Sequence, residues 1–229
     1  MSSGAPGLTL ATEREQVATA ARSLAAQGLV LGTAGNLSAR REELVAVSPT
    51  GAVLSELRPE QVSVVDLDGA LVDGELEPTS ELGLHLGVYR RFATGAVVHT
   101  HAPVATALSC VLEEVPAVHY GMLALGGAVR VAPYATFGTP ELAEQVLDAL
   151  EGKTAALMAN HGAIVHAADV ASALELSLLL EWACTVYWRA ATLGSPRVLD
   201  DDDLAAVLSA VLERGYGGVR SAAPGGSPE

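Results

Sequence analysis

Two histidines separated by one residue, His99 and His101, are the part of the sequence with the clearest chemical potential. They follow an apolar run that predicts a β-strand, and side chains at positions i and i+2 of a strand project from the same face. A third histidine, His161, lies in a predicted turn with the sequence Asn-His-Gly. Three neutral imidazoles form the ligand set of a catalytic zinc, or of another divalent metal, with one coordination position left open. The spacing therefore indicates a metal-dependent enzyme.

Glu81 is the acidic residue whose position bears most directly on such a site. It follows the Pro-Thr-Ser sequence of residues 78–80, close to the start of a predicted helix. A carboxylate there either interacts with the helix dipole or acts as an acid/base group beside the metal. The residues alone leave both interpretations open. The other histidines, His85, His119 and His166, are interpreted as structural, and His85 is one helical turn from Glu81, with which it could pair.

Three polar loops are candidates for binding a substrate. Residues 35–38, 48–51 and 78–80 each combine hydroxyl or amide donors with flexible backbone. Together they could form an anion-binding nest, whereas each one alone is typical of ordinary turns. None of the three contains Lys or Arg. A phosphate bound there would depend on backbone dipoles, neutral donors and a nearby metal ion.

Apolar periodicity, capping residues and turn signals predict intermixed helices and strands. The predicted helices span residues 12–27, 78–91, 103–111, 139–150 and 169–193, with a last one ending near 214 after the acidic residues 200–203. The predicted strands span residues 44–47, 62–67, 70–72, 95–101, 129–133, 154–159 and 163–166. Thr12 and Glu15 form a predicted capping box, and Asp68-Gly69 a predicted hairpin turn. The predicted fold class is α/β, a single-domain layered sandwich with a central mixed, mainly antiparallel sheet flanked by helices.

Composition narrows the partners and the location of the protein. A formal net charge of −14 argues against nucleic acid and anionic membrane surfaces, which both favour clustered Lys and Arg. The N-terminus shows no signal peptide, and charges at Glu175 and Glu181 interrupt the most apolar helix, so we expect no membrane span. Cys110 and Cys184 lack metal or redox spacing and are expected to be buried, reduced thiols. The predicted location is cytoplasmic.

In combination, the loops and the histidines resemble the class II aldolase/adducin-head superfamily, most closely its L-fuculose-1-phosphate aldolases. The segments that carry the resemblance are Gly35-Asn36-Leu37-Ser38, Ser48-Pro49-Thr50-Gly51, Pro78-Thr79-Ser80-Glu81, His99-Thr100-His101-Ala102, Val118-His119-Tyr120, Ala132-Pro133-Tyr134-Ala135-Thr136-Phe137-Gly138-Thr139 and Asn160-His161-Gly162. The resemblance places one class II aldolase domain at residues 12–216. Residues 1–11 are then a flexible N-terminus, and residues 217–229, rich in Gly, Ser and Pro, a disordered tail.

The resemblance also implies a role for each candidate residue. One Zn²⁺ ion per subunit, or another divalent metal, is expected on the metal ligands His99, His101, His161 and Glu81. Glu81 is also expected to act as general base and acid. The substrate phosphate is expected on Asn36, Thr50, Gly51, Thr79 and Ser80. Tyr120 is expected to exchange a proton at the aldehyde oxygen in a neighbouring subunit's site, which Tyr216 helps to close, in a cyclic homotetramer with active sites between subunits.

The activity implied by the resemblance is retro-aldol cleavage. We expect a zinc-dependent aldehyde-lyase that cleaves a ketose 1-phosphate, such as L-fuculose 1-phosphate, into dihydroxyacetone phosphate and a short aldehyde. Two alternatives remain open, a 5-deoxypentulose-1-phosphate aldolase and a pentulose-5-phosphate 4-epimerase. Epimerases of this superfamily typically carry Asp at the position of Glu81, which favours an aldolase. A non-catalytic adducin-head module is less favoured, because such modules lose the histidine set.

Overall fold

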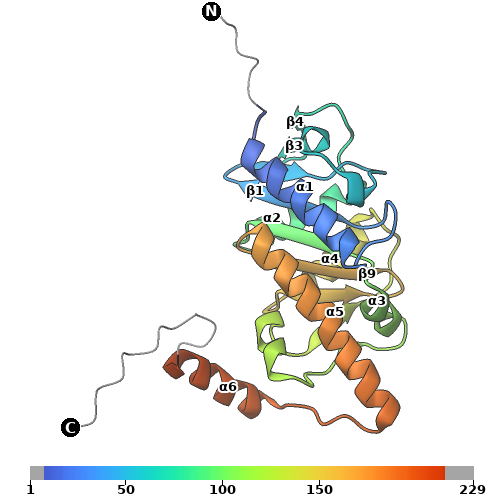
Figure 1. Cartoon of the computed structure of the whole chain (residues 1–229), viewed down its shortest axis with the longest axis vertical. Coiled ribbons are helices and arrows are strands. Elements are labelled where there is room, and N and C mark those ends of the chain that lie inside the picture. The colour runs from blue at the N-terminus through green and yellow to red at the C-terminus, as the bar shows by residue number, and fades with distance from the viewer. Residues whose placement is uncertain (1–7, 215–229) are drawn as a thin grey trace, which may run out of the picture.

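A nine-stranded sheet organises the protein, and the computed structural model describes residues 8–214 of the chain (Figure 1). The strand order is β4-β3-β2-β1-β5-β9-β8-β7-β6. The strands are β1 Asn36–Arg41, β2 Leu44–Val47, β3 Ser63–Asp66, β4 Leu71–Asp73, β5 Ala96–Thr100, β6 Glu114–Val115, β7 Val129–Ala132, β8 Ala155–Met158 and β9 Gly162–Ala167. Only β7 and β8 pair in parallel, so the predicted mixed, mainly antiparallel sheet is confirmed.

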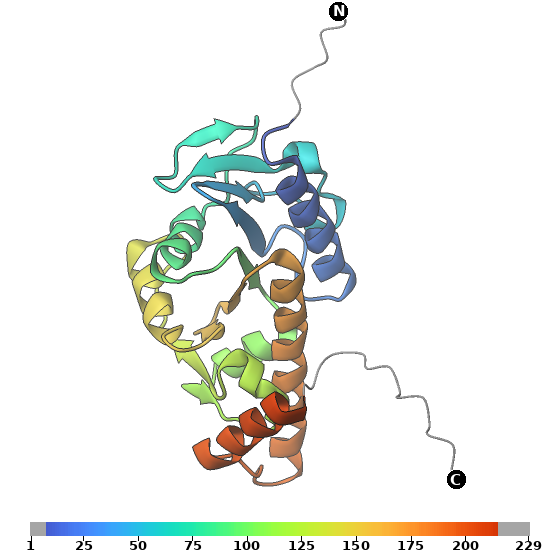
Figure 2. The same cartoon turned by 90° about the vertical axis from the view of Figure 1, so that its left-hand side faces the viewer.

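Helices cover both faces of this sheet, as the layered prediction requires (Figure 2). The helices α1 Ala11–Ala26, α3 Pro103–Ser109 and α5 Val170–Leu193 share one apolar core with the sheet. The helices α2 Leu82–Arg91 and α4 Pro140–Ala149 pack on the opposite face around a second core. The last helix, α6 Asp201–Arg214, lies beside the 3-10 helix η3 Tyr120–Leu125. Two short 3-10 turns, Leu54–Glu56 and Pro59–Gln61, connect β2 to β3.

The predicted capping box at the first helix is wrong. Helix α1 begins at Ala11, so Thr12 already lies inside its first turn, and no side chain caps the preceding Leu10. A partly buried ion pair holds this end of the helix instead, because Arg14 Nη2 lies 2.8 Å from Asp73 Oδ2 on β4. The caps predicted for the later helices do form, since Thr139 accepts a hydrogen bond from Leu142 and Asp169 accepts one from Ser172.

Helix α5 corrects the expectation that no segment could span a membrane. This helix of 24 residues contains a stretch of 18 with a mean hydropathy of 1.3, so it is long and apolar enough to do so by length and composition alone. In the structure it packs along the sheet against β5 and β9 and against α1 and α3. Its apolar character is therefore accounted for in part by the core. Cys184 on this helix is buried, whereas Cys110, expected to be buried, is exposed at the end of α3.

Candidate metal centre and anion cavity

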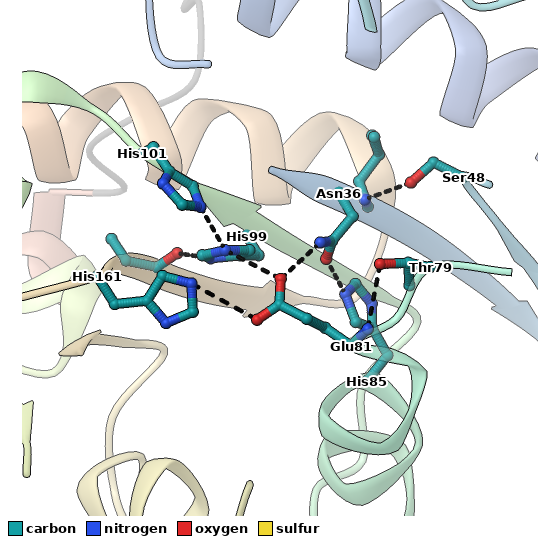
Figure 3. A network of polar contacts seen from close by, with 10 residues as sticks. Asn36, Ser48, Thr79, Glu81, His85, His99, His101 and His161 are labelled. Carbon is teal, nitrogen blue, oxygen red and sulfur yellow. Dashed lines mark hydrogen bonds and ion pairs between the residues drawn. The ribbon is translucent and has the colours of Figure 1, made fainter. Parts of the chain in front are cut away.

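Three histidines converge where the central strand β5 ends (Figure 3). His99 lies on β5, His101 follows that strand directly, and His161 lies in the turn between β8 and β9. Their ligand atoms all lie within 4.8 Å of one another. The Nε2 atoms of His99 and His101 are 2.9 Å apart. The sequence spacing therefore predicted a cluster that the structure brings together.

Backbone geometry around the β8–β9 turn fixes the orientation of the cluster. His99 Nδ1 donates to the carbonyl oxygen of Ala163 at 2.9 Å, which leaves Nε2 as the lone-pair atom directed toward the other imidazoles. Asn160 takes a left-handed conformation with φ of 56°, which Asn tolerates better than most residues. A Cβ atom at Gly162 would lie 2.3 Å from the carbonyl oxygen of Thr100. The Asn-His-Gly sequence is thus the one that lets this turn approach β5.

The Glu81 carboxylate faces the histidines from the start of α2. Its Oε2 atom lies 3.2 Å from His99 Nε2, and its Oε1 atom lies 3.6 Å from His161 Nε2. Oε1 is buried and accepts no hydrogen bond from the described part of the chain. Burial opposes ionisation, but attraction to His99 in its protonated form at acidic pH and the hydrogen bond from Asn36 hold the pKa of Glu81 below its usual value. Glu81 is therefore an ionised carboxylate with one oxygen atom available to a cation.

The donor set fits a divalent metal ion. Burial lowers the pKa of His99 to about 4 and also lowers that of His101, so both imidazoles are neutral at pH 7. Neutral imidazole nitrogens and one carboxylate oxygen are ligands that zinc accepts readily. The unpartnered Oε1 of Glu81 is the atom that such an ion would satisfy.

Two of the polar loops are joined by backbone hydrogen bonds beside the metal cluster. The amide of Thr50 donates to Glu77 at 2.9 Å, and the amide of Thr79 donates to Ser48 at 3.1 Å. Ser48 is buried, and its hydroxyl oxygen accepts from the Leu37 amide at 3.1 Å, which ties these loops to β1. The loops predicted from turn chemistry therefore form one cradle.

A cavity of 460 Å³ joins this cradle to the metal cluster. The predicted residues that line it are Asn36, Thr50, Gly51, Thr79, Ser80, Glu81, His101 and His161. His99, fully buried, lies beneath them. Among the described residues that line the cavity, none is Lys or Arg. All of the predicted phosphate and metal residues that the structure describes thus converge on one cavity.

Of the further residues that line the cavity, four have polar or aromatic side chains to which the sequence assigned no role. Thr33 belongs to the glycine-bearing loop before β1, and Asn160 precedes the third histidine. Tyr134 and Phe137 also line the cavity, with 64% and 65% of their surfaces exposed. The aromatic residues lie within a segment that carries the family resemblance, and this was the only signal available for them.

Tyr120, one of the two tyrosines predicted to act in catalysis, does not line this cavity in its own chain. Tyr120 begins η3 and is 46% exposed, and it is not among the described residues that line the cavity of its own chain. Its ring lies 4.3 Å from that of His119, centroid to centroid. Tyr216 lies outside the described residues. The role of both tyrosines in a neighbouring subunit stays a prediction.

The sequence profile of the class II aldolase and adducin N-terminal domain family matches residues 15–188. The chain therefore belongs to this family, whose aldolases are metal-dependent, and the prediction of a class II aldehyde-lyase is confirmed. It is 38% identical over 200 residues to a 5-deoxy-D-ribulose 1-phosphate aldolase of Bacillus thuringiensis serovar kurstaki, covering 86% of this chain and 94% of the relative.

Other relatives differ in the substrate that their names give. An L-fuculose phosphate aldolase of Escherichia coli K12 is 38% identical over 184 residues, covering 79% of this chain and 85% of the relative. A 3-oxo-tetronate 4-phosphate decarboxylase of Haemophilus influenzae is 35% identical over 191 residues, covering 79% and 89%. A solved structure of an L-fuculose 1-phosphate aldolase superposes with a TM-score of 0.86 at 33% identity, covering 91% of this chain and 100% of that one.

Proposed function

We propose that the protein is a zinc-dependent aldolase that cleaves a ketose 1-phosphate into dihydroxyacetone phosphate and a short aldehyde. The observation that carries the proposal is the single cavity lined by metal-binding histidines, by Glu81 and by loops of neutral donors. Relatives named as aldolases of 5-deoxyribulose 1-phosphate and of fuculose phosphate support the substrate class. Both substrates share the phosphorylated three-carbon end and differ only in the aldehyde that leaves.

Each group of residues has a defined task in this reaction. The donors of Asn36, Thr50 and Thr79 bind the phosphate, which places the C3–C4 bond of the sugar beside the metal cluster. When bound, a divalent cation supplies the positive charge that stabilises the electrons released as this bond breaks. A base takes the C4 hydroxyl proton, and the departing fragment becomes the aldehyde. Glu81, ionised before the reaction, accepts a proton as general base and then delivers it to C3 of the remaining fragment.

The assembly state follows from the same proposal. We infer a cytoplasmic homotetramer in which Tyr120 and Tyr216 reach the cavity of a neighbouring subunit. A second exposed aromatic residue near Tyr120 supports a contact there, since Trp182 on α5 is 45% exposed. The ring of His119 lies between Tyr120 and Trp182, with centroid distances of 4.3 and 4.7 Å. Size-exclusion chromatography with light scattering measures the mass of the assembly. A monomer would refute this inference.

The activity test is a cleavage assay over a panel of ketose 1-phosphates and 5-phosphates, with enzymatic detection of dihydroxyacetone phosphate. We expect cleavage of L-fuculose 1-phosphate or of a 5-deoxypentulose 1-phosphate, loss of activity after chelation, and recovery with Zn²⁺. The ratio of kcat/KM for the two sugars decides between them. Epimerisation of a 5-phosphate without release of dihydroxyacetone phosphate would refute the proposal in favour of the epimerase.

Glu81→Gln tests the assignment of the acid/base residue. Glutamine keeps an oxygen atom that can accept from Asn36, but it cannot exchange a proton. We expect inorganic phosphate to bind with nearly unchanged affinity while kcat falls roughly 100-fold or more. Turnover close to that of the wild type would show that another group moves the proton.

A further inference from the structure

A buried chain of side-chain hydrogen bonds lies behind the anion cavity (Figure 3). Asn36 Nδ2 donates to Glu81 Oε2 at 2.8 Å, and Asn36 Oδ1 lies 2.6 Å from His85 Nε2. The other ring nitrogen, His85 Nδ1, lies 2.7 Å from the Ser38 hydroxyl, which lies 2.8 Å from the Tyr89 hydroxyl. His85 is fully buried. The expectation that His85 simply pairs with Glu81 is therefore wrong, since its ring bonds to two residues of β1.

The spacing of these residues in the sequence explains why they meet. Asn36 and Ser38 are at positions i and i+2 of β1 and so project from one face of the sheet. Glu81 directly precedes α2, and His85 and Tyr89 follow it at intervals of four along the helix, which places all three on one side. The polar side of α2 thus packs against the face of β1 that carries Asn36 and Ser38.

Chemistry fixes the direction of every bond in the chain. The ionised Glu81 carboxylate can only accept, so Asn36 must turn its NH₂ group toward it. The carbonyl oxygen of Asn36 then faces His85 and requires a donor, so His85 carries its proton on Nε2. Nδ1 accepts from Ser38, and the oxygen atom of Ser38 accepts from Tyr89. Burial supports this arrangement, because it lowers the pKa of His85 to about 4 and raises that of Tyr89.

We propose that His85 is a positioning residue that fixes the orientation of the Asn36 amide, so that its NH₂ group faces Glu81 and the anion cavity. The inference rests on the proposed function, in which this cavity binds a sugar phosphate. An amide nitrogen has two hydrogens, and Asn36, which lines the cavity, donates one to Glu81 and keeps the second for the phosphate. A flipped amide would turn its carbonyl oxygen toward two anions. His85 prevents this by supplying a donor on the opposite side.

Variants of His85 separate this role from a structural one. The amide nitrogen of Gln reaches about as far as Nε2 of His, whereas that of Asn reaches only about as far as Nδ1. His85→Gln therefore retains a donor for Asn36, whereas His85→Asn and His85→Leu lose it. We expect His85→Leu and His85→Asn to weaken binding of inorganic phosphate to the zinc-loaded protein roughly tenfold or more, because a bond to a charged group is lost. We expect His85→Gln to bind phosphate within about threefold of the wild type.

A matched control accounts for any loss of stability. His166 is a partly buried histidine whose Nε2 bonds to the Lys153 carbonyl at 3.1 Å, at the far end of β9. His166→Leu should lower the melting temperature and leave the phosphate dissociation constant unchanged. Equal phosphate affinity in wild type, His85→Leu and His85→Asn would overturn the proposal. The proposal would also be overturned if His85→Gln bound phosphate as weakly as His85→Leu does.

The protonation of His85 provides a readout that does not depend on activity. In ¹⁵N NMR spectra of protein labelled at histidine, we expect a neutral His85 with its proton on Nε2 throughout pH 6 to 8. A proton on Nδ1 would overturn the proposal. A protein with the expected tautomer and phosphate affinities that cleaves no ketose phosphate would refute the proposed function and leave the role of His85 intact. Cleavage of a ketose phosphate by a protein whose His85 carries its proton on Nδ1 would support the proposed function and refute the role of His85.

Discussion

Glu181 in the middle of helix α5 is expected to stabilise the metal site without contacting it. Its Oε1 atom accepts from the Val104 amide at 2.9 Å, and its Oε2 atom accepts from the Ala105 amide at 2.8 Å. These amides belong to the first turn of α3, which begins two residues after His101. That helix has no side-chain cap of its own. Glu181 therefore acts as its cap from another helix and fixes the chain where it leaves His101.

The contacts set the size of the effect. Removal of a helix cap costs about 0.5–2 kcal/mol, and hydrogen bonds to a charged group contribute about 1.5–3 kcal/mol each, reduced here by partial exposure. We expect Glu181→Ala to lower the free energy of unfolding by about 2–3 kcal/mol. For a domain of this size the melting temperature then falls by roughly 4–12 °C. We also expect the zinc dissociation constant to rise about tenfold, because loss of a group that orients a metal ligand typically weakens metal binding 10- to 100-fold.

Two measurements test this reasoning, thermal unfolding of the metal-free protein and competition with a chelator for zinc. Glu175→Ala is the matched control, because Glu175 lies on the same helix, carries the same charge and is exposed. It should leave both quantities within error of the wild type. Unchanged zinc affinity in Glu181→Ala, with a lowered melting temperature, would show that α3 does not position His101. Unchanged values of both would show that the two hydrogen bonds contribute nothing measurable.

Three further predictions follow from the same structure. Asp73→Ala removes the carboxylate from the buried Arg14 guanidinium, which keeps its bonds to the Thr9 and Val62 carbonyl oxygens, so the free energy of unfolding measured in urea should fall by about 1–2 kcal/mol, with kcat unchanged; equal stability would refute the role of this pair. Gly162→Ala places a Cβ atom 2.3 Å from the Thr100 carbonyl oxygen, so bound zinc per chain, measured by elemental analysis, should fall well below that of the wild type. The pKa of His85 is lowered from 6.5 to about 4, so the unfolded chain binds more protons below pH 6.5, and stability should fall by on the order of 3 kcal/mol between pH 7 and 4. This loss of stability between pH 7 and 4 should be smaller in His85→Gln. An equal loss in the wild type and in the variant would show that His85 is not its source.

Local rules predicted most of the fold because most elements carry their own signals. The hairpin at Asp68-Gly69 needed a left-handed glycine, and Gly69 has a φ of 91°. The caps at Thr139 and Asp169 were identified from the same kind of local chemistry. The start of α1 was wrong because a distant residue, Asp73, decides it through Arg14. A sequence window contains no information on a partner that the fold brings in from another strand.

The site shows the same division between local and distant determinants. The i and i+2 spacing of His99 and His101 was sufficient to predict a shared direction. Strand β1 was missed, although Leu37 and Ala39 alternate with polar residues along it, because it is short and contains none of the β-branched or aromatic residues typical of strands. The role of His85 depends on that strand. The intervals of four between Glu81, His85 and Tyr89 predicted that they share one side of a helix, but not which residues lie opposite them. The polar row on α2 becomes informative only when β1 lies opposite it.

The charges of the site imply that anion binding depends on the metal. The protein has a formal net charge of −14, and the described residues that line the cavity include no Lys or Arg. His99 is neutral at pH 7 and Glu81 is ionised, so without a cation the site presents a negative charge to a phosphate. A divalent ion reverses that sign. By linkage, a bound phosphate must then strengthen metal binding by the same factor as the metal strengthens phosphate binding. A phosphate site built from neutral donors therefore binds its anion more tightly when the histidine cluster holds its metal ion.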